Sequence, residues 1–169
     1  LTVGGNLPFR RLCVEMGADV TVGEMAVVKK LLGGSPSEFA LLKSHPDERM
    51  FGVQLADKRT ETLVEGARLA ESRGARFVDL NCGCPIHDVI KRGMGATLLQ
   101  RPNRLADLVA AMVTALPVPV TVKIRLGWSG DDINASEVAA LLQQAGAAAI
   151  TLHARTREQR YTKAADWDW

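Results

Sequence analysis

The residues best suited to chemistry lie in one stretch, in which a glycine separates two cysteines. A short strand-like segment, 77–81, is followed by Cys82-Gly83-Cys84-Pro85. The glycine permits a sharp turn, and the proline fixes φ in a way that suits the first turn of a helix. We therefore expect the Cys84 thiol at the end of a strand and beside a helix N-terminus. Gly93-Met94-Gly95 predicts a second turn, where the backbone can approach a ligand closely.

A cysteine in this position has a catalytic and a structural interpretation. An ordinary thiol has a pKa of about 8.5, so it is protonated at neutral pH and can act as a general acid. Cysteine is, however, often a small buried hydrophobic residue. The position at a strand end favours chemistry for Cys84. We interpret Cys82 as a packing residue, and we place Cys13 in the core because it lies on the apolar stripe of an expected helix.

Composition limits the classes of protein to which the chain can belong. Apolar residues make up 47% and charged residues 24% of the 169 residues, as in globular proteins. The formal net charge of +2 is too small to indicate nucleic-acid binding by itself. We predict no membrane span, because no apolar run is long enough, and no metal site, because no second Cys/His pair has zinc-ligand spacing. The three cysteines indicate a reducing, intracellular setting and no disulfide framework.

Strand and helix patterns alternate along the chain, with no hairpin signal between them. The expected helices cover 6–16, 26–32, 60–72, 103–116 and 134–145, the last with Asn134 as its N-cap. The expected strands cover 20–23, 51–55, 77–81, 120–125 and 148–153. This alternation predicts a parallel sheet with right-handed crossovers, which fits both a doubly wound sheet and a (β/α)8 barrel.

The alternation of side chains across each strand favours the barrel. One face of the expected strands carries polar residues, namely Gln54, Asp79, Asn81, Thr121, Lys123, Arg125, Thr151, His153 and Arg155. Aliphatic residues occupy the opposite face. Helices cover both faces of a doubly wound sheet, where repeated buried cations would be costly. In a barrel the polar face converges on the mouth that holds active sites. We therefore predict an α/β fold, a (β/α)8 TIM barrel.

With these elements in place, the sequence resembles the tRNA-dihydrouridine synthases. The resemblance rests on four motifs in order: Asn81-Cys-Gly-Cys-Pro85, Gly93-Met-Gly-Ala96, Val122-Lys-Ile-Arg-Leu-Gly127 and His153-Ala-Arg-Thr156. Other segments, such as 5–10 and 157–163, are most similar to the eukaryotic branch that modifies position 47. The resemblance implies an FMN-dependent barrel enzyme that acts on tRNA, with NADPH as electron donor, in the cytoplasm and also in the nucleus.

The resemblance also implies that the chain is part of a longer protein. Both ends are expected to be cut, because Leu1 begins in a strand-to-helix loop and Trp169 ends where another helix should start. Residues 1–169 would form one partial catalytic domain with about six of the eight barrel strands, counting a first strand before Leu1. The last two strands, a helical tRNA-binding domain and N-terminal zinc-finger segments would lie outside it. We expect this segment alone to lack activity.

The family pattern assigns roles to individual residues. Reduced FMN would deliver hydride to C6 of a uracil while Cys84 protonates C5. The positions that correspond to cofactor contacts are Leu1, Thr2, Gln54, Lys123 and His153. The positions assigned to substrate are Asn81, Arg125 and Arg155. An amide such as that of Asn81 offers both a donor and an acceptor to a uracil edge.

Two other functions fit the sequence. One is a barrel flavoenzyme that acts on a free pyrimidine, and the other is a non-catalytic segment that binds flavin or RNA. The basic stretch 157–163, in which Tyr161 can stack on a base, favours the RNA enzyme, although such charges also suit a solvated surface. The sequence indicates no protein partner.

Overall fold

The computed structural model describes residues 5–169, so Leu1 and Thr2, which the sequence assigns to the cofactor, lie outside it. A parallel sheet organises the chain. Its strands follow the order β1-β3-β4-β5-β8. Their bounds are Val20–Val22 for β1, Met50–Ala56 for β3, Phe77–Cys82 for β4, Val120–Arg125 for β5 and Ala149–His153 for β8. Each pairs in parallel with the next, as predicted from the alternation of elements.

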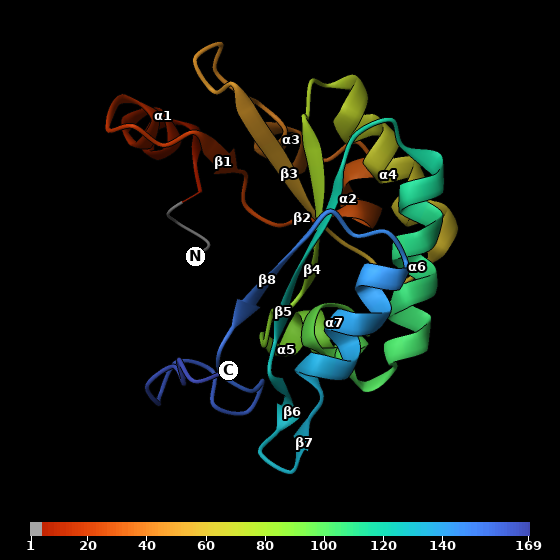
Figure 1. Cartoon of the computed structure of the whole chain (residues 1–169). Helices are drawn as coiled ribbons and strands as arrows, with labels where there is room; N and C mark the ends of the chain where they lie inside the picture. Colours follow the sequence, from red (N-terminus) through yellow and green to blue (C-terminus); the bar gives the residue numbers. More distant parts are fainter. Residues whose placement is uncertain (1–4) are drawn as a thin grey trace.

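Helices cover one face of this sheet. Figure 1 shows α2 (Val28–Leu32), α4 (Thr60–Ser72), α6 (Pro102–Ala115) and α7 (Ala135–Gln144) along one side of the strands. The shorter elements are α3 (Pro36–Leu41), α5 (His87–Lys91) and the 3-10 helix η1 (Gly95–Gln100). No helix within residues 5–169 combines the length and the hydropathy needed to cross a membrane.

The arrangement is a half-barrel. The helices pack on the convex face, whereas α1 (Leu7–Glu15) and the C-terminal segment lie toward the other side (Figure 1). A doubly wound sheet would have helices on both faces. The predicted fold class, an incomplete (β/α)8 barrel, is therefore confirmed.

The predicted alternation of side chains is confirmed on β3, β4 and β5. Their aliphatic residues are buried in the core against the helices, namely Val53, Leu55, Val78, Leu80, Val122 and Ile124. Cys82 belongs to the same core and is 0% exposed, which confirms its interpretation as a packing residue. The polar residues of these strands consequently face the concave side.

Two local predictions of secondary structure are wrong. Residues Ala26–Val27 form a strand, β2, that pairs with β3 beyond β1, so the helix α2 begins only at Val28. The chain also contains a hairpin, because β6 (Gly127–Ser129) pairs antiparallel with β7 (Asp132–Ile133). The strands β2, β6 and β7 are each only two or three residues long, too short to produce a recognisable alternation.

Two predictions about helices are corrected as well. The stripe on α1 is not part of the core: Phe9 and Leu12 are about half exposed, and Cys13 is only partly buried. The one buried side chain of α1 is Arg10. Asn134 is the N-cap residue of α7, as predicted, but its side chain makes no capping bond; its Nδ2 donates to the carbonyl of Leu99 at 2.8 Å.

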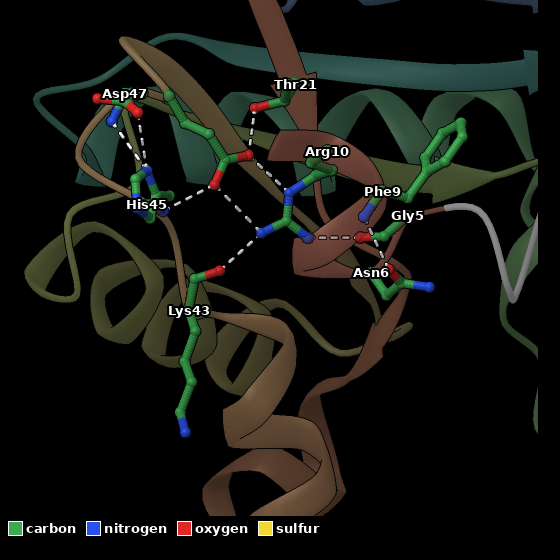
Figure 2. Close-up of polar contacts among 9 residues, drawn as sticks. Gly5, Asn6, Phe9, Arg10, Thr21, Lys43, His45 and Asp47 are labelled. Carbon is green, nitrogen blue, oxygen red and sulfur yellow. Dashed lines mark hydrogen bonds and ion pairs between the residues drawn. The ribbon is translucent and has the colours of Figure 1, made fainter. Parts of the chain in front are cut away.

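The burial of Arg10 is explained by a cluster of polar groups (Figure 2). Its Nε donates to Oε1 of Glu48 at 2.7 Å, and its other nitrogens donate to the carbonyls of Lys43 and Gly5. Glu48 also accepts the Thr21 hydroxyl at 2.7 Å and the His45 amide at 2.8 Å. We call these residues the Arg10–Glu48 cluster. It attaches the N-terminal helix to the segment that leads into β3.

Candidate functional site

The concave face of the half-barrel forms a hollow of about 910 Å³. It extends from the first residues of the strands, where Val20, Met50 and Phe77 line it, to the loops after their last residues. The polar strand residues that line it are those predicted from the alternation of side chains, namely Gln54, Asp79, Asn81, Thr121, Lys123, Arg125, Thr151 and His153, and Glu24 and Tyr161 line it from outside these strands. The cysteine loop 83–86 borders the same hollow. A space of this size suits a large cofactor or a nucleobase.

The backbone of Cys84 is held on both sides. Its N–H donates to Oδ1 of Asn81 at 2.9 Å, and its carbonyl accepts the N–H of Ala96 at 3.2 Å. The second contact requires glycine at position 95, where φ is +61° and a Cβ would lie 2.7 Å from the Cys84 carbonyl oxygen. The close backbone approach predicted for Gly95 is therefore made to the cysteine loop. The thiol itself is partly buried and borders the hollow.

A series of hydrogen bonds between side chains of β3, β4 and β5 leads to this loop and holds its backbone. Asn81 uses its Oδ1 for the N–H groups of Gly83 and Cys84, and its Nδ2 donates to Oε1 of Gln54 at 2.8 Å. Gln54 in turn donates to Oδ2 of Asp79 at 2.7 Å. The hydroxyl of Thr121 donates to Oδ1 of Asp79 at 2.6 Å. We call Thr121, Asp79, Gln54 and Asn81 the amide relay.

Lys123 lies beside Asn81 in the register of β4 and β5 and also faces the hollow. Within residues 5–169 its ammonium group makes no hydrogen bond and no ion pair. Burial lowers the pKa of Lys123, the charge of Arg125 lowers it further, and the Asp79 carboxylate raises it. A half-buried cation without a partner in this part of the chain is poised to bind an electron-rich ligand.

His153, at the end of β8, contributes a neutral imidazole. Burial and the charges of Arg125, Lys123 and Arg155 lower its pKa to about 4. Its Nε2 lies 2.9 Å from Nη1 of Arg155, and a guanidinium can only donate, so Nε2 is the acceptor and the proton resides on Nδ1. The ring of Tyr161 stands 5.8 Å from the imidazole. Arg155 thus lies behind His153 and is not part of the wall of the hollow.

Arg125 is 1% exposed and connects the cysteine loop to the C-terminal segment. Its Nε donates to the Gly83 carbonyl at 2.7 Å, and its Nη1 donates to the carbonyls of Thr156 and Arg160, both at 3.0 Å. The guanidinium also lies 5.3 Å from the ring centre of Tyr161. Three of its N–H donors are therefore used inside the protein, and only those of Nη2 remain outside these bonds.

The structure thus brings together Cys84, Asn81, Gln54, Lys123, Arg125 and His153, with Arg155 behind them. The prediction from sequence did not assign roles to Asp79 or Thr121, although both stand on the expected polar face. The ammonium of Lys123, which has no partner in the described part of the chain, and the Nδ1–H of His153 are donors whose chemistry fits the polar edge of a planar ring such as a flavin. Residues 5–169 include no group of three His, Cys, Asp or Glu side chains that could hold a metal ion.

Comparison with known proteins gives a consistent result. A sequence model of the dihydrouridine synthase family (Dus) matches residues 5–169. Proteins named tRNA-dihydrouridine(47) synthase, with the qualifier NAD(P)(+), are 47% identical in Coprinopsis cinerea and, as a "-like" protein, 48% identical in Homo sapiens. Each alignment covers 100% of this chain and 26% of the relative. The chain spans about a quarter of the length of these curated relatives. Since the family model matches almost all of it, the chain belongs to the dihydrouridine synthase family.

Proposed function

We propose that the full-length protein reduces a uridine in tRNA to 5,6-dihydrouridine, with FMN as cofactor and NADPH as electron donor. The family and the relatives' names support the reaction and the nicotinamide donor. The observation that carries the proposal is the position of Cys84 at the wall of a hollow that also presents a neutral imidazole and the Lys123 ammonium, which has no partner among residues 5–169.

Cys84 is the proposed proton donor. When bound, FMN would supply a hydride to C6 of the uracil, and the proton from the Cys84 Sγ would complete the reduction at C5. A general acid must be held within hydrogen-bond reach of the atom that it protonates. The bonds from the Cys84 N–H to Asn81 and from the Ala96 N–H to the Cys84 carbonyl supply that fixed position.

Lys123 and His153 are the proposed contacts to the cofactor. A cation that faces the ring edge favours negative charge there, and the Nδ1–H of His153 adds a neutral donor. Gln54 contributes less than the sequence implied, because its Nε2 and its Oε1 are both engaged in the amide relay. Asn81 is likewise engaged through both ends of its amide, so its role toward a uracil is restricted to its remaining N–H.

The test is the Cys84→Ala variant of the full-length protein. We expect it to bind FMN and to accept electrons from NADPH as the wild type does. Its rate of uridine reduction in tRNA should fall by roughly 10²–10⁴-fold, the usual contribution of a general acid. Stopped-flow absorbance follows the flavin, and mass spectrometry of tRNA digests follows dihydrouridine.

Cys82→Ala is the matched control. Cys82 lies two residues away but is fully buried on the helix side, and burial, together with the charge of Asp79, raises the pKa of its thiol well above the ordinary value. The uridine rate of this variant should match the wild type. If Cys84→Ala kept the wild-type rate of uridine reduction and Cys82→Ala lost it, the assignment of Cys84 as the proton donor would be wrong. Turnover of free uracil in preference to tRNA would instead indicate the pyrimidine enzyme.

A further inference from the structure

The amide relay has a direction, and one residue sets it. A side-chain amide can be turned so that its oxygen and nitrogen exchange places, whereas an ionised carboxylate only accepts hydrogen bonds. Because Asp79 accepts, Gln54 must present its NH2 group to it and its oxygen to Asn81. Asn81 must then present its own NH2 group to Gln54, which leaves its oxygen for the N–H groups of Gly83 and Cys84.

Burial of the Asp79 carboxylate costs free energy, because a charged group is removed from water. Asp79 is 6% exposed, and burial raises the pKa of its carboxyl group. Among the described residues it has no ion-pair partner, because both of its oxygens accept from neutral groups, those of Thr121 and Gln54. Lys123 acts on it only through its electrostatic field. An aliphatic or amide side chain would fill the same position at a lower cost of desolvation.

We propose that Asp79 is a positioning residue, which fixes the Cys84 thiol by forcing the Asn81 carbonyl toward the backbone of the cysteine loop. Asp79 itself does not reach the loop; it acts through Gln54 and then Asn81. The consequence for catalysis rests on the proposed function, since a displaced thiol would no longer lie in line with the atom that it protonates. The consequence for the loop holds whatever the reaction is.

The test exchanges the carboxylate and the amide between Asp79 and Gln54 in the full-length protein. Asp79→Asn alone replaces the carboxylate, which only accepts, by an amide that can also donate to Gln54, so position 79 no longer imposes the direction of the relay. In the double variant Gln54→Glu/Asp79→Asn, Asn at position 79 donates to Glu at position 54, whose other oxygen still accepts from Asn81. The exchange therefore restores the direction of the relay with the net charge unchanged.

The first readout is hydrogen exchange at the Gly83 and Cys84 amides. Loss of the bonds to Asn81 should make these amides exchange roughly tenfold faster in Asp79→Asn, as expected for one hydrogen bond, and the double variant should return within about twofold of the wild type. The amides of β5 serve as the internal control and should not change. The second readout compares the rate of flavin reduction by NADPH with the rate of uridine reduction. Only the rate of uridine reduction should fall in the variant whose loop amides exchange faster.

Exchange at Gly83 and Cys84 that equals the wild type in Asp79→Asn, or that stays fast in the double variant, would overturn the proposal. If Asp79→Asn does not fold, Asp79→Ser takes its place, because a hydroxyl can donate as well as accept. It should also accelerate the two amides, and no change would equally overturn the proposal. Thr121→Val is the matched control: it removes a donor to Asp79 but leaves the carboxylate bonded to Gln54, so exchange should stay close to that of the wild type. A wild-type protein without uridine reduction, but with the expected exchange pattern, would refute the proposed function alone.

Discussion

Two buried polar networks of this half-barrel differ in how completely they are paired: the Arg10–Glu48 cluster beside the start of β3, and the amide relay, which leads from the strands to the cysteine loop. In the Arg10–Glu48 cluster, a guanidinium and a carboxylate bind each other, and neighbouring carbonyl, amide and hydroxyl groups occupy further positions (Figure 2). At the hollow, the amide relay ends at the partly buried Cys84, and Lys123 beside it has no partner within residues 5–169.

The difference separates a network that stabilises the fold from one that prepares a reaction. A closed, charge-balanced cluster lowers the energy of the folded state and offers nothing to a ligand. An open network holds groups whose preferred partners must arrive with a ligand, and it does so at some cost in stability. Substitutions in the first region should therefore change stability, and substitutions in the second should change binding and rate.

The largest expected effect on stability comes from Glu48→Ala. The side chains of Arg10 and Glu48 are 5% and 0% exposed, so the substitution leaves a buried guanidinium without its counter-charge. Breaking a buried ion pair in this way costs about 3–5 kcal/mol of unfolding free energy. Urea denaturation measures it directly.

Asp47→Ala is the control for that prediction. Asp47 is adjacent and pairs with His45 at 3.2 Å, but its side chain is 74% exposed. An exposed pair contributes below about 1 kcal/mol. Equal losses in the two variants would show that burial of the Arg10–Glu48 cluster is not what makes it stabilising.

Lys123→Met should weaken ligand binding without lowering stability. Burial already disfavours the Lys123 charge, so its removal should leave the free energy of unfolding unchanged or slightly higher. Binding of FMN should weaken by roughly 10- to 100-fold, the value of one hydrogen bond to a charged group. Flavin titration followed by fluorescence measures this, with the exposed Lys29→Met on α2 as control. Full flavin affinity in Lys123→Met would remove Lys123 from the site.

The sequence predicted which side chains face the hollow better than it predicted the hydrogen bonds that hold those side chains. The alternation along β3, β4 and β5 is a local property, and it placed Gln54, Asn81 and Lys123 on the concave face. Hydrogen-bond partners depend instead on residues brought together from distant segments. Asp79 and Thr121, 42 residues apart, illustrate this, because no local pattern indicates that they meet.

The error on α1 has a related cause. Apolar residues at helical spacing predicted a buried stripe, but α1 lies at the edge beyond β1, and the residue that it buries is Arg10. Its burial depends on Glu48, which is 38 positions away. Helical periodicity identifies a helix, but only the position of that helix on the sheet decides which face is covered.

The smallest expected effect is a difference in how the two networks respond to pH. For Glu48, burial by itself raises the pKa, but the bonds from Arg10, His45 and Thr21 outweigh it, so the folded-state pKa lies below the ordinary 4.5. Its contribution to stability is therefore complete above about pH 4.5 and is lost as the pH falls through the lower, folded-state value. For Asp79 burial prevails and raises the pKa above 3.8, so the folded state binds the proton more tightly than the unfolded state.

The contribution of Asp79 consequently declines as the pH rises from about 3.8 through its raised folded-state value. Relative to the wild type, Asp79→Asn should gain stability as the pH rises across this range. Glu48→Gln should instead lose stability relative to the wild type as the pH rises from strongly acidic values toward 4.5. Urea midpoints for the three proteins between pH 3 and 7 test this, and slopes of the same sign for both variants would contradict it.

The contacts of Arg125 also impose an order on folding. This guanidinium joins Gly83, 42 residues before it, to Thr156 and Arg160, which follow it by 31 and 35 residues. Contacts that close such long loops form after local structure, and during synthesis they must wait until the later partner has left the ribosome. Helix α4 and the pairing of β3 with β4 need no residue beyond 82, but the cysteine loop reaches its final position only after residue 160 is available. The cysteine loop is thus set in place late, on a scaffold that is already formed.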